Sequence, residues 1–239
     1  MTPIGFFELL GFGPRGWGQS MLMATAMTLA VSVCGFLAGS VFGTLAAFAK
    51  LSENRLARVV GDAYTTILRG IPDLLVIYLF YFGGSLALTA VGRSFGYDGF
   101  LGLPAFLTGA LALGIVSGAY QAEVFRGAYL ALAKGELEAA RAMGMSHGLM
   151  FRRIIAPQVL RYAIPGLGNV WQLALKESAL ISVTGLVELL RQSQIGAGST
   201  RQPFTFFFAA AILYLALTTV STWGFRRAES HAMRGVRRA

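Results

Sequence analysis

The sequence is short of charge and nearly free of cysteine and histidine. Only 13% of its 239 residues are charged, whereas a soluble domain carries about 25%. Cys34 is the single cysteine, so no disulfide can form within the chain. The two histidines, His147 and His231, lie in polar segments with no cysteine nearby, which argues against a metal site.

The chain also lacks the glycine-rich loop that binds nucleotide phosphates. It contains no GxxxxGK[ST] motif and no Gly-Lys dipeptide. No nucleophile is combined with a base and an acid in a pattern typical of catalysis. We therefore expect no catalytic site and no cofactor or metal bound by this chain.

The sequence contains long runs of residues without any charge. Residues 20–49 carry no charge, and this run is longer than the roughly 20 apolar residues with which a helix crosses a bilayer. The pattern predicts an all-α membrane protein with about five spans, at residues 20–49, 63–92, 99–122, 157–184 and 203–225. Residues 1–19 precede the spans, and residues 228–239 form a basic tail.

Glycine recurs at helical spacing within two of these runs. Gly35, Gly39 and Gly43 fall on one face of the first predicted helix, and Gly114 and Gly118 fall on one face of the third. Small residues at this spacing allow two helices to approach closely. We therefore expect a helix-packing surface here, with a pore-lining role as the alternative.

The basic residues are distributed unevenly between the loops. Segments 50–62, 126–161 and 226–239 hold 14 of the 20 lysines and arginines. By the positive-inside rule these segments are cytoplasmic, which places the amino terminus outside and the carboxyl terminus inside. The net charge of +9 is therefore explained by orientation in the membrane, and no nucleic-acid partner is expected.

One polar segment, residues 135–157, interrupts the apolar pattern between two predicted spans. Gly135 is expected to cap a short helix that carries Glu136 and Glu138 near its start, where acidic side chains favour the helix dipole. Gly144 is placed to end that helix in a left-handed conformation, and Ser146 to begin a second helix. The segment is predicted to form a helix, a sharp turn and a helix that re-enters the membrane.

The surface of this short helix is unusually small. Ala139, Ala140 and Ala142 favour helix and carry almost no side-chain bulk, so a protein partner can approach the backbone closely. The alternative is an amphipathic connector that rests on lipid headgroups through Arg152 and Arg153. The residues alone do not decide between these two interpretations.

Several charges are expected inside the membrane, where an ion needs a partner or a function. Arg69 and Asp73 are four residues apart and are predicted to pair on one helix face, near a bend at Gly70–Pro72. The other embedded groups are Glu123, Lys176, Glu177 and the neutral Gln172. They either fix helix packing or line the path of a cationic substrate, which the slight excess of acids favours.

The polar segment resembles a known motif. Glu138-Ala139-Ala140, Gly144, Ile154 and Pro157 match the EAA loop of membrane subunits of bacterial ATP-binding-cassette (ABC) importers, with Ala156 where that pattern has leucine. Other segments, over about residues 20–227, resemble the polar amino acid permeases, in particular Q-type subunits for histidine, lysine, arginine and ornithine and for opines. These segments begin at Glu53, Tyr64, Arg69, Gly118, Phe125 and Arg161.

The resemblance implies a type I importer in the bacterial inner membrane. Its partners would be an ATPase dimer, which uses the ATP, a periplasmic substrate-binding protein and a related M-type permease in a heterodimer. The motif implies ATPase docking by Glu138, Ala139, Ala140 and Gly144, and more weakly by Met143 and Ser146. The substrate path is assigned to Arg69, Asp73, Glu123, Gln172 and Glu177.

Three alternatives remain open at this stage. The first is a permease for another polar amino acid, such as glutamine or glutamate. The second is a secondary transporter or channel that works alone, which would be expected to contain inverted repeats. The third is a membrane scaffold, which would leave the embedded charges unexplained.

Overall fold

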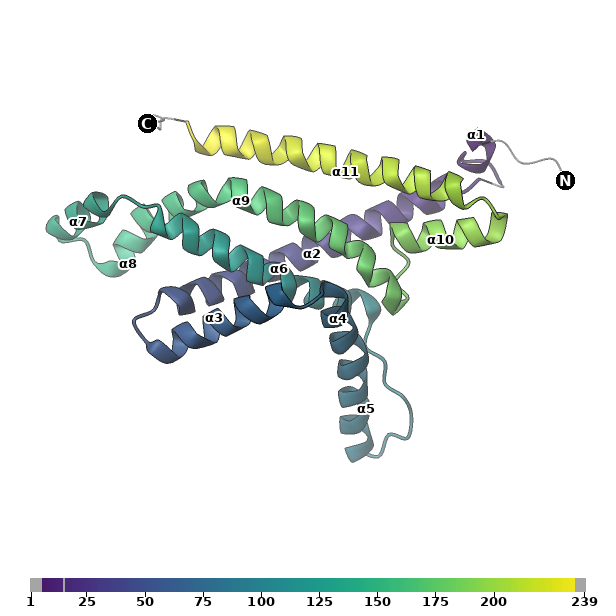
Figure 1. The fold of residues 1–239 in the computed structure, drawn as a ribbon, viewed down its shortest axis with the longest axis horizontal. Coiled ribbons are helices and arrows are strands. Elements are labelled where there is room, and N and C mark those ends of the chain that lie inside the picture. The colour runs from purple at the N-terminus through teal and green to yellow at the C-terminus, as the bar shows by residue number, and fades with distance from the viewer. Residues whose placement is uncertain (1–5, 15, 235–239) are drawn as a thin grey trace.

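The molecule is a bundle of long helices. The computed structural model describes residues 6–14 and 16–234, and every regular element in that part of the chain is helical. Four long helices lie side by side along the long axis (Figure 1): α2 (Gly18–Leu51), α6 (Ala105–Leu130), α9 (Ala156–Glu177) and α11 (Pro203–Ala232). The predicted all-α class is confirmed.

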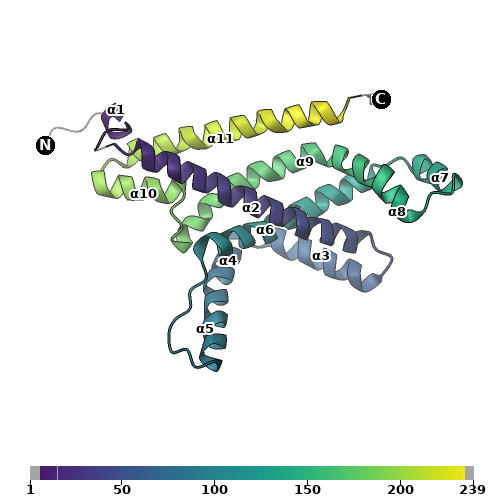
Figure 2. The same cartoon turned by 180° about the vertical axis from the view of Figure 1, so that it is seen from behind.

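Shorter elements occupy the ends and one side of this bundle. The helices α7 (Lys134–Ala142) and α8 (His147–Met150) lie at one end, and α1 (Phe6–Leu9) and α10 (Leu189–Thr200) lie at the other (Figures 1 and 2). The remaining elements are α3 (Arg55–Gly70), α4 (Asp73–Tyr78), α5 (Gly84–Ser94), the π-helical turns η1 (Leu79–Gly83) and η2 (Phe151–Ile155), and the 3-10 helix η3 (Ser178–Thr184).

Four helical segments are long and apolar enough to cross a membrane. They are Gly18–Leu51, Asp73–Ser94, Ala105–Leu130 and Pro203–Ala232. The fourth predicted span corresponds to α9, which is long enough to cross but is not among these four apolar segments. The predicted count of five spans therefore depends on α9 and stays a prediction.

The glycines of α2 are packed against α6. A Cβ atom on Gly39 would lie 2.7 Å from Gln121 Nε2, and one on Gly43 would lie 3.0 Å from the Gly118 carbonyl oxygen. Gln121 Nε2 donates a hydrogen bond to the Phe36 carbonyl at 3.0 Å, across the same contact. The helix-packing interpretation of these glycines is confirmed.

The second predicted span, residues 63–92, is not one straight helix. Helix α3 ends at Gly70 and α4 begins at Asp73, while Ile71 and Pro72 between them have extended backbones. Proline has no N–H for the helical hydrogen bond and disfavours helical geometry in the residue before it. The predicted bend is confirmed, and beyond it α4 and α5 project from the side of the bundle (Figures 1 and 2).

A buried carboxylate organises the end of the bundle at α10. Glu188 is 0% exposed and caps α10, because it accepts hydrogen bonds from the backbone N–H groups of Leu190 and Arg191 at 2.8 and 2.7 Å. Tyr214 of α11 donates to the same carboxylate at 3.1 Å. Burial raises the pKa of Glu188, and these hydrogen bonds oppose that rise. We interpret Glu188 as a structural cap that joins α10 to α11.

Candidate functional site

The short helix α7 begins two residues earlier than predicted. Ala133 has an extended backbone and is the N-cap, so Gly135 is the second residue of the helix. The prediction that Gly135 caps the helix was therefore wrong. Glycine is among the residues preferred at an N-cap, but the extended backbone of that position suits Ala133 equally well.

The turn after α7 has the predicted left-handed geometry. Gly144 has a φ of +74°, and its N–H donates to the Arg141 carbonyl at 2.9 Å. Met145 N–H donates to the Ala140 carbonyl at 3.1 Å, which satisfies another carbonyl at the helix end. Ser146 is the N-cap of α8, with an extended backbone. Both predicted boundaries of the turn are confirmed.

Most residues of the EAA motif are exposed, but one is buried. Glu138, Ala139, Gly144 and Ser146 are exposed, and Met143 is 84% exposed at the tip of the turn. The exception is Ala140, which is 5% exposed in a small core that also contains Leu132, Met150 and Ile155. Ala140 therefore anchors α7 to its own loop and contributes little surface to a partner.

The intramembrane charges are arranged differently from the prediction. The break at Ile71–Pro72 separates Arg69 from Asp73, and no ion pair joins them in the described part of the chain. Instead, the Arg69 guanidinium lies 5.4 Å from the centre of the Tyr120 ring. The predicted pairing of Arg69 with Asp73 on one helix face was wrong because the helix ends between them.

Asp73 lies beside Glu177 instead. Both carboxylates, together with Arg69, are close enough to Tyr120 to act on it electrostatically. Glu177 is 8% exposed, and its buried Oε2 has no hydrogen-bond partner among the described residues. Four elements, α3, α4, α6 and α9, thus bring two acids, a guanidinium and a phenol together at the helix break.

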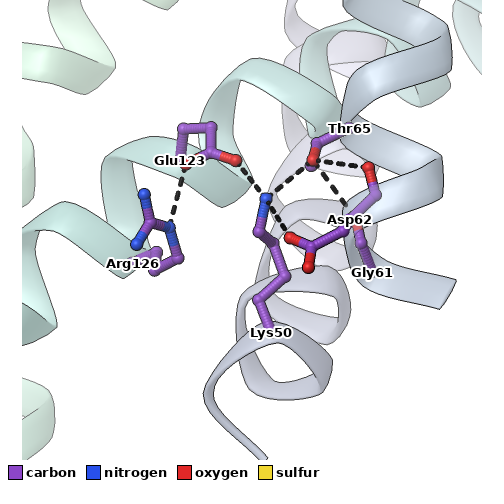
Figure 3. A network of polar contacts seen from close by, with 6 residues as sticks. All are labelled: Lys50, Gly61, Asp62, Thr65, Glu123 and Arg126. Atoms are coloured by element: carbon purple, nitrogen blue, oxygen red, sulfur yellow. Dashed lines mark hydrogen bonds and ion pairs between the residues drawn. The ribbon is translucent and has the colours of Figure 1, made fainter. Parts of the chain in front are cut away.

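Glu123 belongs to a separate network of polar contacts (Figure 3). This network lies near the end of the bundle that is rich in lysine and arginine, which we call the basic end. Glu123 accepts hydrogen bonds from Lys50 of α2 and, at 3.0 Å, from Arg126 of its own helix. Lys50 also bonds to Asp62 of α3 at 3.0 Å and to Thr65 at 2.8 Å. These pairs hold α2, α3 and α6 together, so we interpret Glu123 as a packing residue.

Gln172 also takes part in helix packing. Its Nε2 donates to Thr222 Oγ1 of α11 at 2.6 Å. The neighbouring Trp171 packs edge-on against Phe36 at 5.5 Å. Of the five predicted path residues, the structure therefore brings together Arg69, Asp73 and Glu177, and it places Glu123 and Gln172 elsewhere.

Sequence reasoning missed the two residues that organise these clusters. Tyr120 was not assigned to the path, although it lies one helical turn before Glu123 on α6. Lys50 was counted only among the basic residues of segment 50–62, although its position at the end of a long apolar helix is a signal for an ion pair. In the described residues, no group of three histidine, cysteine or acidic side chains is placed to hold a metal ion.

A comparison with protein families supports this architecture. Residues 39–232 match the family described as "binding-protein-dependent transport system inner membrane component". The chain belongs to this family. It is thus a permease subunit, the non-catalytic membrane component of an ABC importer, and ATP is hydrolysed by a separate subunit.

Individual relatives of this permease match along almost their whole length. The octopine transport permease protein OccQ of Rhizobium meliloti is 61% identical over 98% of this chain and 99% of its own. The histidine/lysine/arginine/ornithine permease protein HisQ of Salmonella typhimurium is 39% identical over 94% and 98%. A crystal structure of an amino acid ABC transporter with histidines has a TM-score of 0.76 and 31% identity, covering 90% of this chain and 95% of that one.

Membership of the family confirms the predicted type I importer permease fold and location in the inner membrane. It also implies three kinds of partner: ATPase subunits, a substrate-binding protein and a second permease subunit. The docking residues, the substrate, the type of the second subunit and the orientation are proposals, and they follow below.

Proposed function

We propose that this permease passes a basic amino acid, or an opine built on one, through the membrane, and that the ATPase drives it through α7. Two relatives are named for octopine and for histidine, lysine, arginine and ornithine. The observation that carries the docking proposal is the exposed turn at Met143–Gly144. An apolar side chain that is 84% exposed beside a left-handed glycine is well suited to enter a groove on a partner.

The position of α7 supports the same assignment. It lies at the end of the bundle where α2 ends at Leu51 and α11 ends at Ala232, which is the end rich in lysine and arginine. By the positive-inside rule this end is cytoplasmic, and the amino-terminal end is periplasmic. A cytoplasmic ATPase can then contact Glu138, Ala139, Met143, Gly144 and Ser146.

A mechanical link joins this surface to the bundle. Ala140 packs α7 onto Met150 and Ile155, and the helical path continues from α8 through η2 into α9. A displacement of α7 by the ATPase would therefore move α9, whose far end carries Glu177 in the intramembrane charge cluster. We propose this connection as the route by which ATPase closure changes the substrate path.

The charge cluster supports a cationic substrate. Asp73 and Glu177 are neighbouring carboxylates in a membrane-embedded position, and a positive charge between them would offset their repulsion. Arg69, whose guanidinium lies over the Tyr120 ring, would hold the carboxylate of the substrate. We further propose that the second permease subunit is an M-type relative, as the resemblance to Q-type subunits implies.

The docking proposal is tested by Gly144→Asp in the complete transporter. An aspartate at φ +74° costs about 1–2 kcal/mol of backbone strain and places a charge on the proposed contact. We expect normal insertion in the membrane fraction, with uptake of radiolabelled arginine and octopine reduced to background. The matched control is Gly148→Asp, because Gly148 is also exposed and has open space around it, but it lies within helix α8.

The outcome that would contradict docking at this turn is normal uptake by correctly inserted Gly144→Asp. Loss of uptake should be accompanied by loss of substrate-stimulated ATP hydrolysis, because the proposed defect lies in coupling. If ATP hydrolysis were still stimulated by substrate while uptake was lost, the turn would not be the coupling element.

A further inference from the structure

The projecting part of the chain contains an irregular segment beside an apolar helix. Helix α5 (Gly84–Ser94) is followed by residues 95–104, which fold back along it as a return segment. Leu101 N–H donates to Thr89 Oγ1 at 3.0 Å, and Leu103 N–H donates to Ser85 Oγ at 3.1 Å. We call α5 and the return segment together the arm.

These two hydrogen bonds fix where the return segment lies along α5. Ser85 and Thr89 lie inside the apolar segment Asp73–Ser94, which has a mean hydropathy of 2.0 and is long enough to cross the membrane. Residues 101–103 therefore lie alongside the Ser85–Thr89 turn of this apolar helix. Figures 1 and 2 show the arm leaving the bundle between its two ends, which places this part of it at the level of the apolar spans. Backbone without regular secondary structure is thus placed in the hydrocarbon region.

Within the arm, only every second backbone N–H group of residues 100–103 donates a hydrogen bond. Among the residues that the structure describes, the N–H groups of Phe100 and Gly102 have no acceptor, in contrast to those of Leu101 and Leu103. Lipid cannot supply one, and irregular backbone at membrane depth is tolerated only against protein or in a water-filled cavity. Because the Phe100 side chain is 69% exposed beside these groups, a protein surface is the better environment.

The arm is also largely free of its own bundle. At the two glycines of α5, the nearest side chains come from its own return segment, with Leu103 next to Gly84 and Leu101 next to Gly92. Only about 22% of the most apolar part of Asp73–Ser94 is buried. Figures 1 and 2 show the arm projecting away from the long helices.

We infer that the arm packs against the second permease subunit of the transporter, with the Phe100–Leu103 backbone covered by that subunit. Among the three kinds of partner, only the second permease subunit can reach the arm inside the hydrocarbon region. The ATPase and the substrate-binding protein are soluble and do not enter that region. This inference rests on the proposed transporter, which requires a second membrane subunit. It adds which surface of this chain makes the contact.

A photo-crosslinking experiment on the complete transporter in bacterial membranes tests the arm. Phe100 is replaced by the photoreactive amino acid p-benzoylphenylalanine, and the matched control carries the same replacement at Phe208 of α11, which is 47% exposed. We expect irradiation of the Phe100 variant to give an adduct with the mass of two permease subunits, several-fold stronger than from the Phe208 variant. Mass spectrometry identifies the second chain.

Other products would overturn the inference. An adduct of Phe100 with lipid alone, with the binding protein or with the ATPase shows that the second subunit does not cover the arm. If the Phe100 variant fails to assemble with the ATPase, the crosslinking is repeated with the same replacement at Phe95, which is 86% exposed on the arm. An adduct with the second permease subunit would again support the inference, and the other adducts would again overturn it.

Uptake measured in the same cells separates this inference from the transport function. Cells that take up substrate without forming the permease adduct would refute the docked arm and leave the importer assignment intact. Cells that form the adduct while the wild-type transporter carries neither arginine nor octopine would support the docked arm and refute the proposed substrate.

Discussion

At the scale of single residues, the embedded charges fall into two groups with different partners. Lys50, Asp62, Glu123 and Arg126 neutralise one another, and their side chains connect helices near the basic end. Asp73 and Glu177 lie together without a cation between them, and Arg69 faces a phenol ring. We interpret the charges that have partners as packing residues, and we propose the two neighbouring acids as the binding site of a cationic ligand.

The change Asp73→Asn tests this distinction. It replaces one of the two carboxyl groups with a neutral amide of similar size, so binding of a cation in the cluster should weaken. We expect uptake of arginine to fall by about tenfold or more, equivalent to about 1.4 kcal/mol, with normal assembly. Concentration-dependent uptake of radiolabelled arginine measures the effect.

The control for this prediction is Asp98→Asn, which neutralises an exposed acid on the return segment of the arm. It should leave the apparent affinity for arginine unchanged. If Asp73→Asn instead prevents co-purification with the ATPase before any change in affinity is detectable, Asp73 is a packing residue and the cationic site lies elsewhere.

At the scale of helices, close approach between α2 and α6 holds the bundle together. The positions of Gly39 and Gly43 place α2 directly on the α6 backbone, and Gln121 bridges the contact through Phe36. In lipid there is little hydrophobic gain from bringing two helices together, so close packing and hydrogen bonds supply the stabilisation.

The substitution Gly43→Val should therefore destabilise the folded subunit. A Cβ atom at this position would lie 2.8 Å from Gln121 Cβ and 3.0 Å from the Gly118 carbonyl oxygen, so the helices must separate. Overpacking of this kind costs about 1–3 kcal/mol. Thermal unfolding in detergent, followed by circular dichroism, should show a lower midpoint.

The matched control for Gly43 is Gly127→Ala, on α6 itself. A Cβ atom there has no neighbour within 4 Å, so the unfolding midpoint should be unchanged or slightly higher. An unfolding midpoint for Gly43→Val equal to that of the wild type would mean that the α2–α6 contact contributes nothing to stability.

The sequence predicted the local features of these elements better than their arrangement. The glycine faces of α2 and α6, the bend before Asp73 and the turns at Gly144 and Ser146 were predictable because each depends on a few neighbouring residues. The pairing of Asp73 with Glu177 was not, because it depends on how α4 meets α9 after the bend. The burial of Ala140 depends in the same way on contacts with Leu132 and Met150, and alanine alone does not signal which of its faces is covered.

At the scale of the whole molecule, the orientation of the bundle depends on whether α9 crosses the membrane. The basic end contains the turn after α2, the α7–α8 region and the end of α11, and the opposite end contains α10 (Figure 1). Helix α9 connects these two ends and contacts both α6 and α11. Its polar side chains are used inside the bundle, as Gln172 and Glu177 illustrate, which is why its hydropathy is lower than that of the other spans.

Cysteine labelling in intact spheroplasts tests this orientation. In a Cys34→Ser background, single cysteines replace Glu53, Ser199 and Ser230, which are exposed residues at the two ends of the bundle. If five spans place the basic end inside, a membrane-impermeant maleimide should label Ser199→Cys directly and the other two only after permeabilisation. A bundle in which α9 does not cross would place Ser199 on the same side as Glu53, so equal protection of those two positions would contradict the five-span topology. It would also remove the mechanical route from α7 to Glu177, because that route requires α9 to run from the cytoplasmic face into the membrane.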